Sequence, residues 1–161
     1  MLVVAIADTH LPRGSRRLSR QCVDHLRRAD LILHAGDLTS AAFLDELRGF
    51  GAPVHAVCGN ADEPALRAVL PEEAVIRAGR ATIALVHDAG SRIRRERRLV
   101  ERFGGCSAVV YGHTHLPQVD LVDGVWILNP GSPTERRRAP WRSLLLLDLQ
   151  AHTIRPELVA V

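Results

Sequence analysis

Five short apolar runs, each with polar side chains just past its C-terminal end, constrain the fold of this chain most strongly. The runs are aliphatic and rich in β-branched residues, as is typical of buried strands. They span residues 2–7, 31–35, 53–58, 81–86 and 108–111. The polar side chains that follow them are Asp8, His10, Asp37, Asn60, His87, His113 and His115. Because ligands of open α/β sheets bind outside the carboxyl ends of the strands, this pattern predicts one polar site at that edge.

The order of the predicted elements indicates how the layers are arranged. Helices are expected at residues 15–28, 40–49 and 91–103, with Ser15 capping the first and Thr39 or Ser40 the second. The first half of the chain alternates strand and helix, and the second half is rich in strands. This order favours two packed sheets with helices outside them. At 161 residues we expect a single domain that spans residues 1–161.

The composition restricts the class of protein and its compartment. With 47% hydrophobic and 24% charged residues, the chain is typical of globular proteins rather than of disordered ones. No apolar run approaches the roughly 20 residues of a membrane span, and residues 2–7 lack the basic flank of a signal peptide. Cys22, Cys58 and Cys106 have the spacing of neither a metal site nor a disulfide framework. We therefore expect a reduced, cytoplasmic protein without a membrane partner.

The basic residues are all arginines and leave a formal net charge of +3. A GC-rich coding bias explains an all-arginine surface as well as a ligand does, but a mildly basic charge favours anionic substrates. Arg92 falls within the apolar arc of the predicted helix at residues 91–103, one turn from His87. It is therefore the arginine that we expect to contact substrate.

The spacing of the ligand-type residues indicates how metal ions could be held. In an extended backbone, side chains at i and i+2 leave the same face about 6.6 Å apart. His113 and His115 would then suit two ions about 3.5–4 Å apart, whereas Asp8 and His10 can converge on one ion. Loop histidines without metal are the alternative. The remaining histidines are expected to be structural: His25, His34, His55 and His152.

Five motifs resemble, in composition and order, those of the calcineurin-like metallophosphoesterase superfamily: Asp8-x-His10, Gly36-Asp37, Gly59-Asn60-x-Asp62, His87 and Gly112-His113-x-His115. The short length, and Asn129-Pro130-Gly131-Ser132 after the histidine pair, are similar to its small bacterial and archaeal phosphodiesterase branch. The resemblance implies a four-layer α/β/β/α sandwich of two mixed β-sheets flanked by helices. It also implies two divalent ions, the first held by Asp8, His10 and His115, the second by Asn60, His87 and His113, with Asp37 bridging them.

The chemistry that the resemblance implies is hydrolysis of a small phosphodiester by a hydroxide that bridges two metal ions. Carboxylate, imidazole and amide donors lead us to expect Mn²⁺, with Ni²⁺, Fe²⁺ or Zn²⁺ as alternatives. Asn60 and Asp62 are the expected catalytic residues, with Asp62 acting as an orienting acceptor. The sequence also allows a homo-oligomer.

Two positions depart from the pattern of the family. Many members have histidine at the position of Ala61, as the acid that protonates the leaving oxygen, and the small branch often has cysteine there. Alanine supplies no proton, so we expect activated diesters to be preferred over alkyl monoesters. Asp88 stands where glycine commonly follows the ligand histidine, and is expected either to repel an anionic substrate or to orient His87.

Two other functions stay open at this point. One is a binding scaffold, because a eukaryotic retromer subunit of the same fold acts as one after losing parts of the ligand set. All seven ligand positions are filled here, which favours catalysis. The other is a nuclease, which clustered arginines permit. No aromatic platform for bases is evident in the sequence, so nucleic acid is not the favoured partner.

Overall fold

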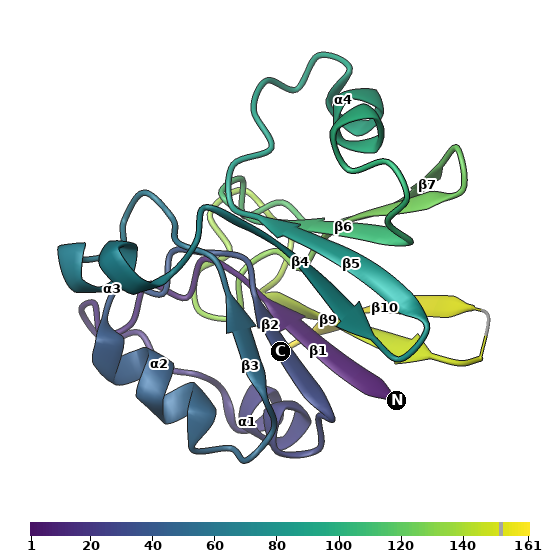
Figure 1. The fold of residues 1–161 in the computed structure, drawn as a ribbon. Helices are drawn as coiled ribbons and strands as arrows, with labels where there is room; N and C mark the ends of the chain where they lie inside the picture. Colours follow the sequence, from purple (N-terminus) through teal and green to yellow (C-terminus); the bar gives the residue numbers. More distant parts are fainter. Residues whose placement is uncertain (152) are drawn as a thin grey trace.

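The strands of this protein form two five-stranded sheets that pack against each other, as Figure 1 shows. The structure is a computed structural model that describes residues 1–151 and 153–161, so the expectation for His152 lies outside the described residues. Both sheets mix parallel and antiparallel strands, as predicted.

The first sheet is built around β1 (Leu2–Ile6). On one side, β2 (Leu31–His34) and β3 (Val54–Ala56) continue it by parallel pairing. On the other side, β9 (Ser143–Leu149) and β10 (Ile154–Ala160) continue it by antiparallel pairing. The strand order is therefore β10-β9-β1-β2-β3.

The second sheet has a parallel centre and antiparallel edges. Its centre consists of β5 (Ala81–Val86), β6 (Ala108–Tyr111) and β8 (Val125–Asn129). The edge strands are β4 (Glu73–Ala78) beside β5, and β7 (Gln118–Val122) beside β8. The order is β4-β5-β6-β8-β7.

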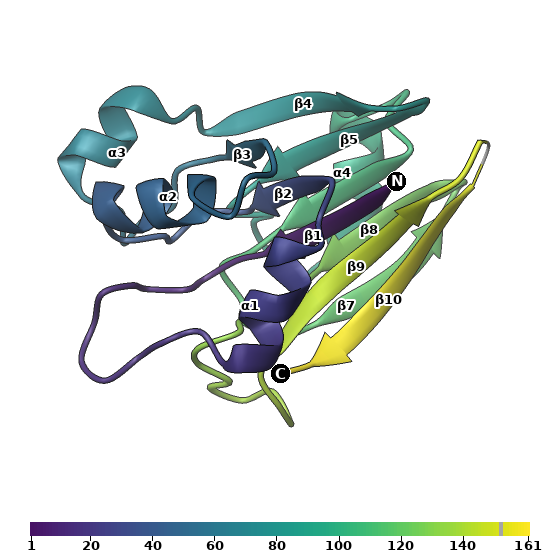
Figure 2. The ribbon, with the colours of Figure 1, turned by 90° about the horizontal axis from the view of Figure 1, so that it is seen from below.

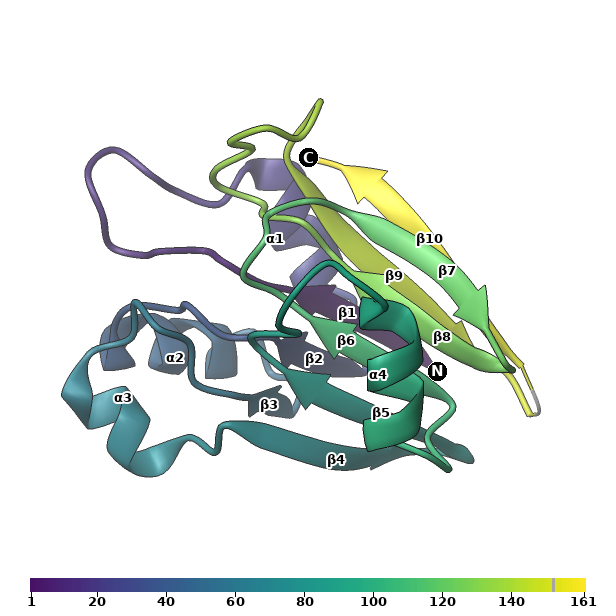
Figure 3. The same ribbon diagram turned by 90° about the horizontal axis from the view of Figure 1, so that it is seen from above.

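The helices lie on the outer faces of the two sheets (Figures 2 and 3). α1 (Arg20–Arg27), α2 (Ala41–Arg48) and α3 (Pro64–Val69) pack on the first sheet. α4 (Arg95–Arg102) packs on the second. The four-layer α/β/β/α sandwich implied by the resemblance is thus confirmed.

The packing of β1 explains its uninterrupted apolar sequence. Val3 and Ala5 belong to the core between the sheets, whereas Val4 and Ile6 belong to the core beneath the helices. Successive side chains of a strand point to opposite faces, so a strand covered on both faces is apolar at every position.

The predicted start of the first helix is wrong, because α1 begins at Arg20 rather than near residue 15. Gly14 has a left-handed φ of 61°, and the Arg16 N–H bonds the Arg13 carbonyl in a turn. The cap is Ser19, whose side chain accepts the N–H of Cys22 at 3.1 Å.

The predicted helix at residues 91–103 is also too long, because α4 spans only Arg95–Arg102. Arg94 has a left-handed φ of 54°, which a helix cannot continue through. Ile93 is 76% exposed rather than part of an apolar arc. Arg92 therefore lies in the turn before α4, exposed to solvent.

Candidate metal centre

The seven predicted ligands lie at one end of the sandwich, on the loops that follow β1, β2, β3, β5 and β6. Five of them have left-handed φ angles between 49° and 66°: Asp8, His10, Asp37, His113 and His115. The extended backbone expected for the two i, i+2 pairs is therefore wrong. A left-handed conformation costs an L-residue about 1–2 kcal/mol, so contacts elsewhere must hold these loops in place.

Asp8, His10 and His115 form the first cluster of donor atoms. One donor atom from each lies within 4.8 Å of the others, and all three residues are buried. The Nε2 atoms of His10 and His115 are 3.3 Å apart. His115 Nε2 lies 3.4 Å from Asp8 Oδ1. The structure thus brings together the three residues expected at the first ion.

The carboxylate of Asp8 is buried without a hydrogen-bond partner on either oxygen in the described chain. Burial raises its pKa to about 7, and the backbone N–H of His113 opposes this rise without meeting hydrogen-bond geometry. A buried carboxylate without donors is costly unless a cation neutralises it. Asp8 is therefore the most direct sign of a cation site.

Asn60, His87 and His113 form the second cluster. Asn60 Oδ1 lies 3.2 Å from His87 Nε2 and 2.9 Å from His113 Nδ1. The rings of His87 and His113 meet edge to face, with centroids 5.2 Å apart. These are the three residues expected at the second ion, and the three loops that carry them converge.

Asp37 lies between the two clusters. Its Oδ2 is 3.7 Å from His10 Nε2, and its Oδ1 is 3.5 Å from His87 Nε2. Burial alone would raise the pKa of Asp37, but the nearby His87 imidazole and the hydrogen bond from the Ala61 N–H outweigh it and lower the pKa to about 2. An ionised carboxylate that faces both clusters fits the bridging position.

Two backbone carbonyls fix the orientation of the ligand rings. His87 Nδ1 donates to the Ala35 carbonyl at 2.8 Å, and His115 Nδ1 donates to the Glu135 carbonyl at 3.1 Å. Each bond places the proton on Nδ1, so Nε2 is left with a lone pair directed at the cluster.

Burial keeps several of these imidazoles neutral, which is the form that binds metal. It lowers the pKa of His10, and lowers that of His115 to about 4. His87 differs, because its contacts with Asp37 outweigh burial and raise its pKa. His34 is buried below the site against Thr9, and burial lowers its pKa to about 3.

Three polar residues hold the ligand loops, a role that the sequence does not predict for them. Asn129 Nδ2 donates to the Gly112 carbonyl at 3.0 Å, just before the histidine pair. Ser132 Oγ donates to the Asp8 carbonyl at 2.8 Å, and Thr134 Oγ1 donates to the Thr9 carbonyl at 2.7 Å. The turn at residues 129–132 was the available signal, but a turn motif does not reveal what its side chains contact.

Two other predicted site residues, Asp62 and Asp88, contact backbone N–H groups rather than the two clusters. Both oxygens of Asp62 accept backbone N–H groups, from Thr39 and Gly59, each at 2.6 Å. Asp62 therefore ties two ligand loops together, and its catalytic role stays a prediction. Asp88 is exposed and accepts the N–H of Gly90 at 2.7 Å.

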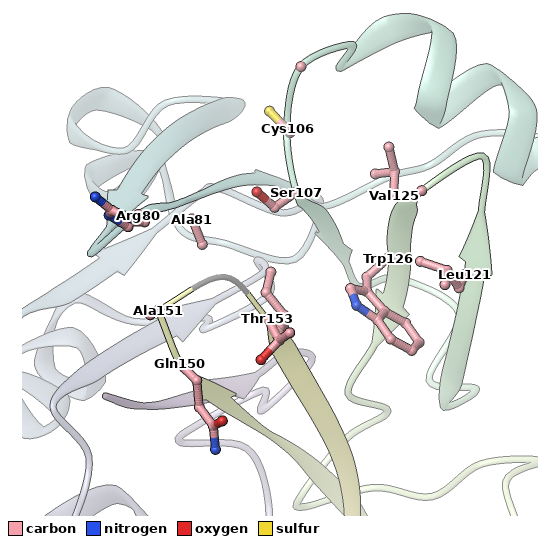
Figure 4. Close-up of a pocket in the computed structure, with 13 residues that line it drawn as sticks. Arg80, Ala81, Cys106, Ser107, Leu121, Val125, Trp126, Gln150, Ala151 and Thr153 are labelled. Atoms are coloured by element: carbon pink, nitrogen blue, oxygen red, sulfur yellow. The ribbon is translucent and has the colours of Figure 1, made fainter.

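Two hollows lie at opposite ends of the strands. One, of about 350 Å³, is lined by Asn60, His87 and His113 together with Arg67 and Arg102. Arg92 is not among the residues that line it, so its contact with substrate also stays a prediction. The other hollow, of about 730 Å³, lies around Trp126 at the far end and includes none of the predicted ligands (Figure 4).

Among residues 1–151 and 153–161, no helix is long and apolar enough to cross a membrane. The longest helices of the described chain have 8 residues.

Comparison with known proteins gives consistent matches along the chain. The model of the calcineurin-like phosphoesterase superfamily domain matches residues 1–152. A probable metallophosphoesterase of Methanocaldococcus jannaschii is 34% identical over 93% of this chain and 77% of its own. Wild-type Vps29 of Entamoeba histolytica, in complex with zinc, is 27% identical with a TM-score of 0.78, over 99% of both chains. An archaeal phosphodiesterase shares the fold with a TM-score of 0.75 at 19% identity, over 99% of this chain and 100% of its own.

Proposed function

This chain belongs to the calcineurin-like phosphoesterase superfamily, and on that basis we propose that it is a phosphodiesterase that uses two divalent metal ions. The observation that carries the proposal is the buried Asp8 carboxylate, which faces the Nε2 atom of His115 and has no hydrogen-bond donor. A cation in contact with Asp8, His10 and His115 would satisfy all three.

The donor set fits two ions. Asp8, His10 and His115 would hold one, and Asn60, His87 and His113 the other, with an Asp37 oxygen directed at each cluster. Oxygen and imidazole donors without a thiolate suit Mn²⁺, and also Ni²⁺, Fe²⁺ or Zn²⁺. The zinc complex of Vps29, a protein of similar fold, supports zinc as one of the candidate metals.

When bound, two such ions supply Lewis acidity to the phosphate oxygens and lower the pKa of a water molecule. The residues of this chain position that chemistry. Ala35 and Glu135 hold the rings of His87 and His115 through their carbonyls. Asn129 and Ser132 hold the loops that carry His113 and Asp8.

Neither Ala61 nor Asp62 is suited to donate a proton to the leaving group. Ala61 contributes only its N–H, which donates to Asp37 Oδ1 at 2.7 Å. Asp62 has both oxygens engaged by backbone N–H groups, so it is unsuited to deliver a proton. We therefore propose that good leaving groups are preferred, and diesters over alkyl monoesters.

The test compares Ala61→His with the wild type on a nitrophenyl diester and on an alkyl phosphate. A placed general acid typically supplies about 10²–10⁴-fold, and a nitrophenolate leaves without one. The histidine should therefore accelerate the alkyl ester far more than the nitrophenyl diester, at unchanged metal content. Equal acceleration of both, or a wild type that already cleaves alkyl monoesters as fast as diesters, would contradict the proposal.

The likeness to Vps29 favours a second candidate, a metal-binding scaffold for a protein partner. The two candidates differ in a simple measurement. A scaffold binds metal but leaves bis(p-nitrophenyl) phosphate intact at every metal concentration, whereas the enzyme hydrolyses it in proportion to bound metal.

A further inference from the structure

A third hollow, of about 490 Å³, lies beside the first metal cluster, because two of its lining residues, Thr134 and Glu135, bond Thr9 and the predicted ligand His115. Its walls come from the loop after β1 and the loop before β9. Five arginines and a single carboxylate line it: Arg13, Arg16, Arg136, Arg137, Arg142 and Glu135. We call it the arginine hollow.

The arginine hollow is tied to the metal centre through its own lining residues. The Glu135 carbonyl accepts the Nδ1 proton of His115 at 3.1 Å. Thr134, which also lines the hollow, donates to the carbonyl of Thr9, between the predicted ligands Asp8 and His10. The wall that carries Thr134 and Glu135 is therefore hydrogen-bonded to the loops of the first metal cluster.

The charge of the arginine hollow is positive and only partly neutralised. Arg16 pairs with Glu135 at 3.0 Å, and Arg137 lies 3.7 Å from the same carboxylate. Within the described residues, neither Arg13 nor Arg142 forms an ion pair, although they face the hollow from different loops. Several guanidinium groups around one carboxylate leave an excess of donors shaped for phosphate oxygens.

We propose that the arginine hollow binds a second phosphate of the substrate, so that the substrate is a phosphodiester carrying at least one further phosphate group. The inference rests on the proposed function, because the scissile phosphate is taken to lie at the metal ions. One phosphate then binds at the ions and the next binds at the arginines, on the His115 side.

The first experiment measures binding without metal, so that catalysis plays no part. A fluorescein-labelled thymidine hexanucleotide is titrated with protein in EDTA at several salt concentrations. The test variant is Arg13→Gln with Arg142→Gln. The matched control is Arg17→Gln with Arg138→Gln, which removes the same charge from neighbouring positions that do not line the hollow. Thermal unfolding verifies that both variants are folded.

The test variant should bind more weakly, and its slope of log affinity against log salt should fall by about 0.7, because the contact with one phosphate of a single strand contributes about that much. The control should keep the wild-type slope. Equal slopes in the two variants would show that the arginines attract anions only through the net charge, and would overturn the proposal.

The second experiment uses the Mn²⁺-loaded enzyme and a thymidine dinucleotide with a 5′-phosphate, with a 3′-phosphate, or with neither. One terminal phosphate should raise kcat/KM in the wild type and the control, and this gain should vanish in the test variant. A dinucleoside tetraphosphate replaces the dinucleotide to decide whether the second phosphate belongs to a pyrophosphate chain or to another diester.

The two proposals fail in different ways. If no diester, including bis(p-nitrophenyl) phosphate, is hydrolysed, the proposed function fails while the salt slopes still decide what the hollow binds. If bis(p-nitrophenyl) phosphate is hydrolysed but terminal phosphates change nothing, the arginine hollow is not a substrate subsite.

Discussion

The two ends of the sandwich use the same unusual backbone conformation but fill it with different residues. At the far end, left-handed positions in the connections between strands are taken mainly by glycine, as at Gly79, Gly105 and Gly124. The ligand end also has left-handed glycines, such as Gly36 and Gly131, but there the conformation is adopted by five of the predicted ligands as well: Asp8, His10, Asp37, His113 and His115. Glycine adopts this conformation without strain, whereas aspartate and histidine do not. Strained residues collected at one end of an otherwise regular fold indicate that their side chains are needed there.

The ends also differ in which kinds of side chain they bury and which they expose. The ligand end buries Asp8 and His115 completely. The far end places Leu121, an apolar residue that is 57% exposed, beside a hollow. If this comparison is right, substitutions at the ligand end should impair metal binding and catalysis, and those at the far end should affect stability alone.

The largest loss is expected from Asp37→Ala. The carboxylate faces both clusters and offsets the repulsion between two cations. Residues that only hold a ligand in place typically change activity by about 10–100-fold, and removal of Asp37 should lower kcat/KM by more than that. Asn60→Ala removes a neutral donor from one cluster and should retain more metal and more activity. Metal content and kcat/KM are measured together. Equal losses in the two variants would contradict the bridging position of Asp37.

A matched pair of substitutions, Gly36→Ala and Gly105→Ala, separates backbone strain from displacement of a ligand. Gly36 and Gly105 have φ angles of 89° and 91°, so alanine is equally strained at both. A Cβ at Gly36 would lie 2.5 Å from His87 Nδ1, whereas at Gly105 nothing lies within 4 Å. Both variants should lose about 1–2 kcal/mol of stability from the backbone. Only Gly36→Ala should also lose activity, by about 10–100-fold, through displacement of His87.

The assay for this pair is chemical denaturation together with kcat/KM on bis(p-nitrophenyl) phosphate. Gly105→Ala serves as the control, since it carries the same backbone strain. A drop in activity for Gly105→Ala as large as that for Gly36→Ala would mean that the far end is coupled to the site.

We expect pH to have a moderate effect on the stability of the fold and on its stabilisation by metal. Burial raises the pKa of Asp8 from 3.8 to about 7, so the metal-free fold keeps a proton that the unfolded chain releases. The contribution of Asp8 to stability is therefore complete at low pH and is lost as pH rises through about 7. His115, with a pKa lowered from 6.5 to about 4, has the opposite dependence and destabilises the fold as pH falls through this range.

Metal binding must displace the proton of Asp8. The rise in melting temperature on adding Mn²⁺ should therefore grow between about pH 5.5 and about pH 8. Calorimetric scans with and without Mn²⁺ measure it. A rise that does not change with pH would show that Asp8 is not among the groups that metal deprotonates.

The smallest effect is expected from Leu121→Ser at the far end. An exposed side chain away from caps, turns and ligands usually changes stability by about 0.5 kcal/mol or less. Activity and metal content should stay at wild-type levels. Loss of activity at unchanged stability would assign the far hollow a functional role.

The sequence predicted the layers and the location of the site, because both depend on simple patterns. Apolar runs become strands, and polar residues at strand ends gather at one edge. It misplaced the starts of α1 and α4, because the extended Ser19 caps α1 and the left-handed Arg94 directly precedes α4. The spacing rule for His113 and His115 assumed an extended chain, and the loops are not extended.

Long-range contacts made the remaining features unpredictable. Ser132 bonds the carbonyl of Asp8, 124 residues away, and Glu135 bonds His115 through its carbonyl rather than its side chain. A backbone acceptor leaves no signature in the sequence. The arginine hollow likewise forms from two segments far apart in the chain.

If the strained ligand end holds two ions, crystals grown with Mn²⁺ should show two peaks per chain in anomalous scattering at the manganese edge. One should lie among Asp8, His10 and His115 and the other among Asn60, His87 and His113, with Asp37 in contact with both. A single peak, peaks elsewhere, or no peak at saturating Mn²⁺ would contradict a two-ion site at this end.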